Sequence, residues 1–486
     1  MVVMIDPQLV RASVETAWDS GIVDVLRRYI EIPNKSPAFD PGWSDHGHMD
    51  RAVEMFVAWA RSRPIDGLTV EVVRLSGRTP LILIEVPATA AGSDEDPDRS
   101  EPRTVLLYGH LDKQPEMEGW DADKGPWQPV LVGERLYGRG GADDGYAMFA
   151  ALSAVEAVRA AGGSHSRLVI MIEASEESGS PDLPAYVDHL VPRLGTVDLV
   201  VCLDSGAADY DALWVTTSLR GLAGGTLEVT MLEEGLHSGS ASGVVPSTFR
   251  ILRHLLDRVE DSATGQILLP ELNAPIPASV VTAAVESAEV LADEVVESLP
   301  FVEGARAVSD DVAELVVNRT WRPTLSVTGL DGAPPPEDAG NVLRPRTRAK
   351  LSFRLPPTVD SQAALEAIEH ALTSDPPYGA RVELTEGEAG PGWCAPELEP
   401  WLAAALTTAS EIHFGRPVGF QGEGGSIPFM GMLGERFPSA QFVVTGVLGP
   451  GSNAHGPNEF LDLPTARRLT ACVAHVLDGH ATRSRS

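Results

Sequence analysis

Three short apolar segments constrain the fold more than any other feature of this sequence. They are TVLLYG (104–109), RLVIMIEAS (167–175) and DLVVCLDS (198–205), and each contains several consecutive large apolar residues. Such short continuous runs are typical of central strands that are buried on both faces of a sheet. A long helical segment at 146–162 lies between the first two runs. Strands that alternate with helices in this way predict an α/β fold.

The pattern changes near residue 217. The next predicted elements are a strand at 219–231, a helix at 247–260, a strand at 349–356, a helix at 361–374 and a strand at 380–386. This order predicts a separate α+β unit, after which the helix–strand pattern resumes at residue 399. We therefore expect a discontinuous α/β domain over 1–217 and 391–486, whose mixed sheet is covered by helices on both faces. A smaller α+β domain over 218–390 is expected to be inserted into it.

Composition and charge exclude several classes of function. The chain has 486 residues and a formal net charge of −32, which disfavours binding to nucleic acid and to anionic membranes. No apolar run approaches the roughly 18 residues of a membrane span. The N-terminal segment lacks a signal-peptide pattern, so we expect a cytoplasmic protein. The three cysteines, Cys202, Cys394 and Cys472, are far apart, so any metal must be held by His, Asp and Glu.

Ionisable residues lie where the predicted strands end. The set comprises His110 and Asp112 after the first strand, Asp143 and Asp144 in a glycine-rich loop, Glu176 and Glu177 after the second strand, Asp204 after the third, and His455 in the loop after a strand at 440–448. The carboxyl ends of strands form the functional edge of an open α/β sheet. Each member alone has a simpler explanation, namely a hydrogen-bonded loop histidine, a helix N-cap or a pair of surface acids.

Taken together, these residues favour a metal centre. Several carboxylates at one sheet edge would repel each other and raise each other's pKa unless cations neutralised them. Two histidines and three carboxylates, without cysteine, suit Zn²⁺, Mn²⁺ or Co²⁺. Two metal ions that share a carboxylate are a common arrangement for hydrolysis.

The motifs around these residues resemble the M20 family of metallopeptidases, and most closely its dipeptidase branch, the carnosinase-like enzymes. The similarity runs over nearly the whole chain and is carried, in order, by YGHLDKQP, GWDADKGPWQPVLVGERLYGRGGADDG, IEASEESGSP, CLDSG, HSG and GSNAHGPNE. The resemblance implies hydrolysis of the amide bond of dipeptides or short peptides with a free C-terminal carboxylate. It also implies a homodimer in which the inserted domain serves as lid and dimerisation domain.

The resemblance further implies two divalent metal ions per subunit, with zinc expected before manganese or cobalt. Asp143 would bridge the two ions. His110 and Asp204 would complete one ligand set, and Glu177 and His455 would complete the other.

Two more acids are given roles by the same resemblance. Glu176 would be the general base that takes a proton from a metal-bridging water. Asp112 would orient His110, since a metal-bound imidazole usually gives its other N–H to an acceptor. The peptide bond between Asp143 and Asp144 would be cis.

Four residues are implied to bind the substrate. His237 would reach the active site of the partner subunit and donate to the oxyanion, unless it only caps the helix at 247. Asn341 would be a second donor or a turn former. Arg354 would bind the substrate carboxylate through its guanidinium, or lie on the wet face of a sheet. Ser426 would bond to the same carboxylate.

Two other functions stay open at this point. The same site would suit an amidohydrolase that acts on N-acyl amino acids. A non-catalytic metal-binding protein is the other alternative, and it predicts loss of a ligand or of the base. The presence of all five ligand candidates together with Glu176 argues against it.

Overall fold

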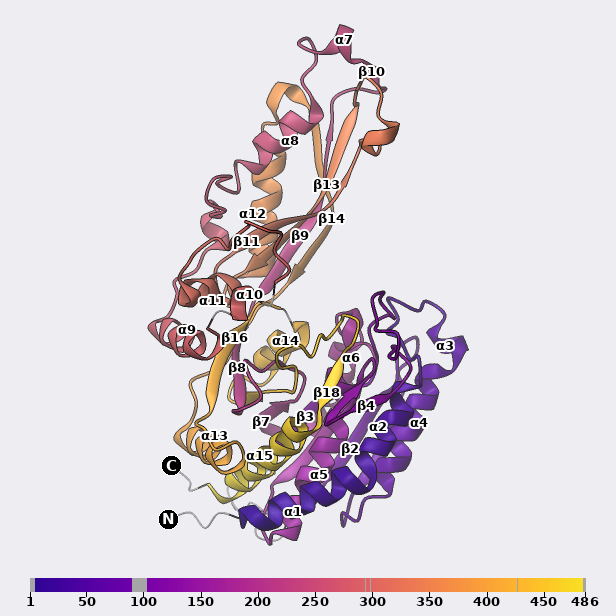
Figure 1. Ribbon diagram of the computed structural model, residues 1–486, viewed down its shortest axis with the longest axis vertical. Coiled ribbons are helices and arrows are strands. Elements are labelled where there is room, and N and C mark those ends of the chain that lie inside the picture. Colours follow the sequence, from indigo (N-terminus) through magenta and orange to yellow (C-terminus); the bar gives the residue numbers. More distant parts are fainter. Residues whose placement is uncertain (1–4, 90–102, 293, 298, 426, 484–486) are drawn as a thin grey trace. The chain divides into compact units, whose positions relative to one another are not determined.

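The apolar runs form neighbouring strands of one large mixed sheet in the computed structural model, which describes residues 5–89, 103–292, 294–297, 299–425 and 427–483 (Figure 1). Its strands are β1 (Thr69–Val73), β2 (Leu81–Val86), β3 (Arg103–His110), β6 (Arg167–Glu173), β7 (Thr196–Cys202), β8 (Trp214–Leu219), β15 (Trp393–Cys394), β16 (Gly419–Glu423) and β17 (Gln441–Val444). Their order is β1-β2-β6-β3-β7-β17-β8-β15, with β16 paired to β8. The central strands β6, β3, β7 and β17 run parallel, and β2 and β8 join them antiparallel.

Helices cover this sheet. They are α1 (Pro7–Ala17), α2 (Val23–Ile30), α4 (His48–Arg61), α5 (Ala147–Ala160), α6 (Leu183–Leu194), α13 (Pro400–His413) and α15 (Leu463–Thr482). Two other helices are α3 (Trp43–His46), which precedes α4, and α14 (Pro428–Arg436), which follows β16. Successive residues of β3 and β6 are buried, so both faces of the sheet are covered. Apolar residues at helical spacing over 8–31 predict one helix, but a π-helical turn at Trp18–Ile22 separates α1 from α2.

A small antiparallel sheet carries two loops that matter for the site. Its strands are β4 (Val130–Val132), β5 (Arg135–Tyr137) and β18 (Phe460–Asp462), in the order β18-β5-β4. Phe460 pairs with Tyr137. The glycine-rich loop that follows β5 therefore starts beside the end of the loop that precedes β18.

The second sheet is fully antiparallel, in the order β11-β13-β9-β14. Alternate residues of β13 are buried, and they pack with α8 and α12 in one apolar core, as the predicted α+β unit requires. The sequence pattern did not predict β11, α9 or α11. The elements of this part are β9 (Gly221–Thr230), β10 (Leu236–His237), α7 (Ser238–Ala241), α8 (Thr248–Leu256), α9 (Ala278–Leu291), α10 (Glu294–Glu297), α11 (Val312–Thr320), β11 (Thr324–Asp331), β12 (Val342–Leu343), β13 (Arg346–Leu355), α12 (Ser361–Thr373) and β14 (Arg381–Gly390).

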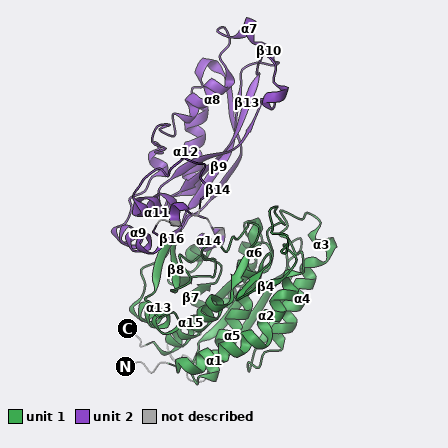
Figure 2. Ribbon diagram, viewed as in Figure 1, with its two compact units in different colours: residues 1–217, 395–421, 432–486 green, residues 218–394, 422–431 purple. Residues whose placement is uncertain are grey.

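The chain divides into two compact units (Figure 2). Unit 1 comprises residues 1–217, 395–421 and 432–486, and unit 2 comprises residues 218–394 and 422–431. The mixed α/β sheet with a second α+β unit confirms the predicted fold class. Within the part of the chain that the structure describes, no helix combines the length and the apolar character needed to cross a membrane.

Candidate metal centre

Three parallel strands bring acids and a histidine to one edge of the large sheet. His110 is the last residue of β3, and it pairs with Glu173 at the end of β6. Glu176 begins a 3₁₀ turn just after β6, and Asp204 follows β7 by two residues. Because these strands are parallel neighbours, their carboxyl ends meet at the same edge.

The loops beside the small sheet add two further residues. Asp143 lies in the turn Gly141–Gly145 that leads into α5, and its own backbone is extended rather than helical, with φ −120° and ψ 92°. His455 lies in the loop before β18, with a positive φ of 63°. The peptide bond between Asp143 and Asp144 is cis, which confirms that expectation.

Asp143 lies between the two histidines. Its Oδ1 is 3.3 Å from Nε2 of His110, and its Oδ2 is 3.0 Å from Nε2 of His455. The same Nε2 of His455 is 3.2 Å from Oε2 of Glu177. Each carboxylate oxygen of Asp143 therefore faces a different imidazole.

His110 also faces the acids on its other side. Its Nε2 is 3.7 Å from Oδ2 of Asp204 and 4.0 Å from Oε2 of Glu176. Two groups of potential ligand atoms have all members within 4.8 Å of one another: His110, Glu176 and Asp204 in one, and His110, Asp143 and Glu177 in the other. The structure thus brings together all five expected ligands and the expected base.

Burial and mutual repulsion disfavour the charged form of the acids in this cluster. Burial, followed by the charge of Asp204, raises the pKa of Glu176 well above its ordinary value. Burial and the charge of Asp143 also raise the pKa of Glu177. Burial raises the pKa of Asp204 to about 7, although the nearby His110 opposes the shift. These carboxylates repel each other and lack sufficient positive charge from the protein.

The pKa values of both imidazoles are also raised, because the neighbouring acids favour the protonated ring. Burial disfavours a charge on His455, but its contacts with Asp143 and Glu177 raise its pKa to about 11. Burial likewise opposes charge on Asp143, yet the two histidines lower its pKa. Oε1 of Glu177 is buried and has no hydrogen-bond partner among the described residues. The raised pKa values mean that the cluster favours additional positive charge, and Glu177 offers an acceptor that no hydrogen bond uses. Both properties suit the binding of divalent cations.

Asp112 contacts the cluster in two ways, one at the turn that carries Glu176 and Glu177 and one at His110. Its carboxylate oxygens accept hydrogen bonds from the backbone N–H of Glu176 at 3.1 Å and of Glu177 at 3.0 Å. Nδ1 of His110 lies 3.1 Å from the main-chain oxygen of Asp112, and 3.5 Å from its carboxylate. Asp112 therefore holds the turn that carries both glutamates as well as facing His110.

Gln114 is a neighbour of the cluster that the sequence reasoning missed. Its Nε2 donates to Oε2 of Glu177 at 2.5 Å. The available signal was its spacing of two from Asp112 in the run YGHLDKQP, since alternate residues of an extended segment point to the same side.

His237 and Asn341 are neighbours within unit 2. His237 pairs with Val342 across β10 and β12, and Ser238 N–H donates to the main-chain oxygen of Asn341 at 2.8 Å. His237 is exposed, and its Nδ1 accepts from Gly239 N–H at 3.1 Å. The alternative that it caps the helix at 247 is wrong, because the cap of α8 is Ser247.

Arg354 lies on β13 and is partly buried. Burial, followed by the positive charges of Arg354 and Arg319, lowers the pKa of Arg220 to about 10. Arg354 therefore belongs to a group of arginines in unit 2 that the sequence pattern did not predict. Ser426 falls outside the described residues.

A mixed α/β sheet with histidines and carboxylates gathered at one edge is typical of a metal-dependent hydrolase. Residues 106–479 match Peptidase family M20/M25/M40. The chain therefore belongs to this family, and it is a metallopeptidase, as the motifs predicted.

Curated relatives and solved structures agree with this assignment. The Cysteinylglycine-S-conjugate dipeptidase of Corynebacterium striatum is 28% identical over 383 residues, which cover 77% of this chain and 80% of the relative. The Beta-Ala-His dipeptidase of Homo sapiens is 28% identical over 369 residues, covering 72% and 69%. The structure of the di-peptidase Dug1p from Saccharomyces cerevisiae superposes with a TM-score of 0.74 at 23% identity, over 99% of each chain, which establishes the shared fold.

Proposed function

We propose that this protein is a dinuclear metal-dependent dipeptidase. The observation that carries the proposal is the position of Asp143, whose two carboxylate oxygens face His110 at 3.3 Å and His455 at 3.0 Å. A carboxylate that directs one oxygen toward each of two imidazoles is suited to bridge two ions, each of which would also be held by one histidine.

The remaining acids complete two ligand sets. We assign His110 and Asp204 to one ion, Glu177 and His455 to the other, and Asp143 to both. Zinc is the proposed metal because nitrogen and oxygen ligands suit it, with manganese or cobalt as alternatives. When bound, the two ions would polarise the scissile carbonyl and increase the acidity of water at the site.

Glu176 is the proposed general base. Its side chain is 14% exposed, so it lies within the cluster yet remains open to a substrate. Its backbone N–H is held by Asp112 at 3.1 Å, which limits the directions in which the carboxylate can point. Glu176 would take a proton from the attacking water and return it to the leaving amine. His455, which is 57% exposed, marks the solvent side of the cluster.

The proposed substrate is a dipeptide or short peptide with a free C-terminal carboxylate. The names of the two curated relatives, a Cysteinylglycine-S-conjugate dipeptidase and a Beta-Ala-His dipeptidase, support this substrate class. Arg354 and Ser426 would bind the carboxylate, and the arginines near Arg354 add positive charge. His237 and Asn341 would donate to the oxyanion, and their adjacency supports a shared role.

A substrate panel tests the reaction. Metal-loaded protein should hydrolyse free dipeptides such as Cys-Gly and β-Ala-His faster than their N-acetyl forms. Faster turnover of the N-acetyl forms would instead indicate an amidohydrolase of N-acyl amino acids, and no turnover on a broad panel would indicate a non-catalytic protein.

Substitution of the base tests the mechanism. Glu176→Gln should lower kcat by about 10²–10⁴-fold while metal content is retained, because only the proton transfer is lost. Glu156→Gln is the matched control, since Glu156 lies on α5 and its nearest cation is Arg63 at 3.9 Å. A Glu176→Gln variant with undiminished kcat would remove this residue from the mechanism.

We also propose a homodimer in which the predicted domain 218–390, which lies within unit 2, is the lid and dimerisation domain, while the predicted domain 1–217 and 391–486 is catalytic. His237 of one subunit would then act in the site of its partner.

Mixed dimers of His237→Ala and Glu176→Gln subunits should regain activity, because one site in each mixed dimer has both residues. If His237 acted within its own subunit, neither site would be complete and the mixture would stay inactive. Zinc as the native metal and a cytoplasmic location stay predictions.

A further inference from the structure

A buried ion pair lies behind the two loops that carry Asp143 and His455. NH1 of Arg139 is 2.6 Å from Oε2 of Glu459, and the two side chains are 1% and 0% exposed. Arg139 follows β5 and Glu459 precedes β18, so the pairing of these strands places them side by side. Neither Arg139 nor Glu459 is among the proposed metal ligands.

Glu459 binds the loop that carries Asp143. Its Oε1 accepts hydrogen bonds from the backbone N–H of Gly140 at 3.0 Å, of Ala142 at 3.3 Å and of Asp143 at 3.4 Å. Three donors that converge on one carboxylate oxygen fix the path of the turn. The N–H of Asp143 itself is among them.

Arg139 binds the loop that carries His455. Its NH2 donates to the main-chain oxygen of Gly456, the residue after His455, at 2.6 Å. Its Nε donates to the main-chain oxygen of Pro115 at 3.2 Å. The guanidinium is therefore linked at once to Glu459 and to the backbone beside His455.

We propose that Arg139 and Glu459 are positioning residues that set the separation of Asp143 and His455 and thereby the affinity for the metal ions. This inference rests on the proposed dinuclear site. The glycine-rich loop has φ values of 142° at Gly138 and 80° at Gly140, conformations that its sequence alone does not enforce. The carboxylate of Glu459 and the guanidinium of Arg139 supply the missing constraint.

Energetics also favour a positioning role over a purely stabilising one. A fully buried ion pair loses hydration and often adds little to stability compared with an apolar pair of similar volume. Here the pair satisfies five main-chain groups in three loops, which an apolar pair would leave without these partners. The benefit of this ion pair over an apolar pair is therefore that it fixes the geometry of those loops.

Zinc titration of metal-free protein against a chromophoric chelator tests the inference without substrate. Glu459→Gln loses the charge that holds Arg139 and should bind Zn²⁺ about 10- to 100-fold more weakly, as residues that orient metal ligands commonly do when replaced. Arg139→Lys keeps the charge but loses the planar fork that reaches both Glu459 and Gly456. It should weaken the ion held by Glu177 and His455 more than the other ion, which gives two separated binding steps.

Asp198→Asn is the matched control for loss of stability alone. Asp198 pairs with His480 at 2.8 Å and with Arg483 at 2.5 Å, elsewhere in unit 1. This variant should lower Tm and leave zinc affinity unchanged. If both Arg139→Lys and a folded Glu459→Gln bind two zinc ions as tightly as the wild type, the inference is overturned, and Arg139→Lys decides the matter alone if Glu459→Gln does not fold. If the wild type bound none of Zn²⁺, Mn²⁺ and Co²⁺, the proposed function would be overturned instead.

Discussion

Two buried histidines that are not members of the candidate metal cluster should make unit 1 sensitive to acid. His413 of α13 and His475 of α15 are 7% and 5% exposed, and their ring centroids are 5.0 Å apart. Nε2 of each ring is buried and has no hydrogen-bond partner among the described residues. Both rings are therefore held in the neutral form.

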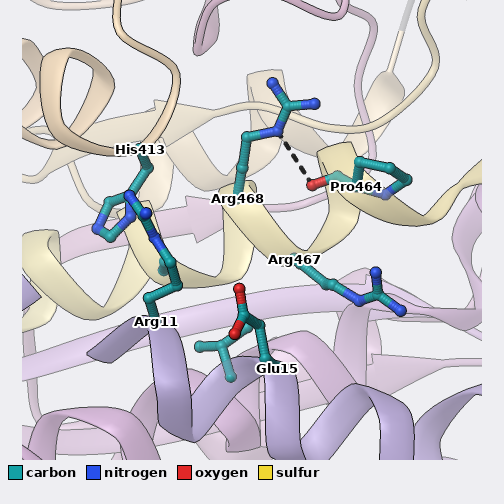
Figure 3. Close-up of a pocket in the computed structure, with 8 residues that line it drawn as sticks. Arg11, Glu15, His413, Pro464, Arg467 and Arg468 are labelled. Atoms are coloured by element: carbon teal, nitrogen blue, oxygen red, sulfur yellow. Dashed lines mark hydrogen bonds between the residues drawn. The ribbon is translucent and has the colours of Figure 1, made fainter. Parts of the chain in front are cut away.

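The surroundings of His413 oppose a further positive charge. Figure 3 shows Arg11 of α1 and Arg468 of α15 in the pocket that His413 lines. Arg467 also lines this pocket, and Glu15 is its single acid. Burial, followed by the charges of His475 and Arg11, lowers the pKa of His413 to about 3. Burial lowers the pKa of His475 to about 4.

The sign and size of the effect follow from these pKa values. Unfolding restores an ordinary histidine pKa of about 6.5, so below that pH the unfolded chain binds protons that the folded chain does not. Stability is then fully present above pH 6.5 and is lost as the pH falls toward 4. The slope of about 1.36 kcal/mol per pH unit gives a loss of about 2 kcal/mol for each histidine between pH 6.5 and 5, or about 4 kcal/mol for both.

The double variant His413→Gln/His475→Gln isolates this contribution, because glutamine does not titrate. Urea unfolding, followed by circular dichroism at pH 8 and at pH 5, gives the free energy of unfolding of both proteins. Other titrating groups affect both proteins alike, so the wild type should lose about 4 kcal/mol more than the variant on acidification. If the two proteins lose stability in parallel, the burial argument is refuted.

Two further perturbations have direct readouts. Gly145→Ala should destabilise the protein by about 1–3 kcal/mol in urea unfolding, because the added Cβ would lie 2.2 Å from the Tyr29 ring and 2.5 Å from the Gly140 oxygen. Gly21→Ala, whose Cβ meets nothing within 4 Å, is the control and should be neutral or up to about 1 kcal/mol more stable. Removal of metal by a chelator should abolish peptidase activity and lower Tm, since an ion at 100 times its Kd adds about 2.7 kcal/mol to stability, and added zinc should restore both. Full activity in chelated protein would contradict the proposed function.

The sequence predicted the central sheet well because its signal is local. Each of the runs at 104–109, 167–175 and 198–205 is apolar at consecutive positions, and burial on both faces requires this. The interruption at Trp18–Ile22 could not be predicted, because apolar spacing continues through it and both Trp18 and Ile22 are buried. The strand β11 was missed because it has no alternating burial and most of its residues are exposed.

The residues of the candidate site also differ in how well local sequence signals predict them. The candidate ligands are of few residue types and follow predicted strands or lie in loops at that sheet edge, so position and chemistry placed His110, Asp143 and Glu177 in the candidate set. The resemblance to the M20 family then divided that set into expected ligands and an expected base. Residues that support them are recognised only by contacts between distant segments. Arg139 and Glu459 are 320 positions apart, and Gln114 and Glu177 are 63 positions apart.

Glu459 illustrates why such residues escape sequence reasoning. It ends the run GSNAHGPNE, where a glutamate before a short strand is indistinguishable from a surface acid. Only the pairing of β18 with β5 places its carboxylate against the N–H groups of the loop that carries Asp143. The charge of such a buried acid is already neutralised by a guanidinium and by backbone donors. Its proposed role is therefore to position the loop beside it. If Arg139 and Glu459 have the proposed positioning role, the geometry of the cluster depends on residues that are recognised only once the chain is folded.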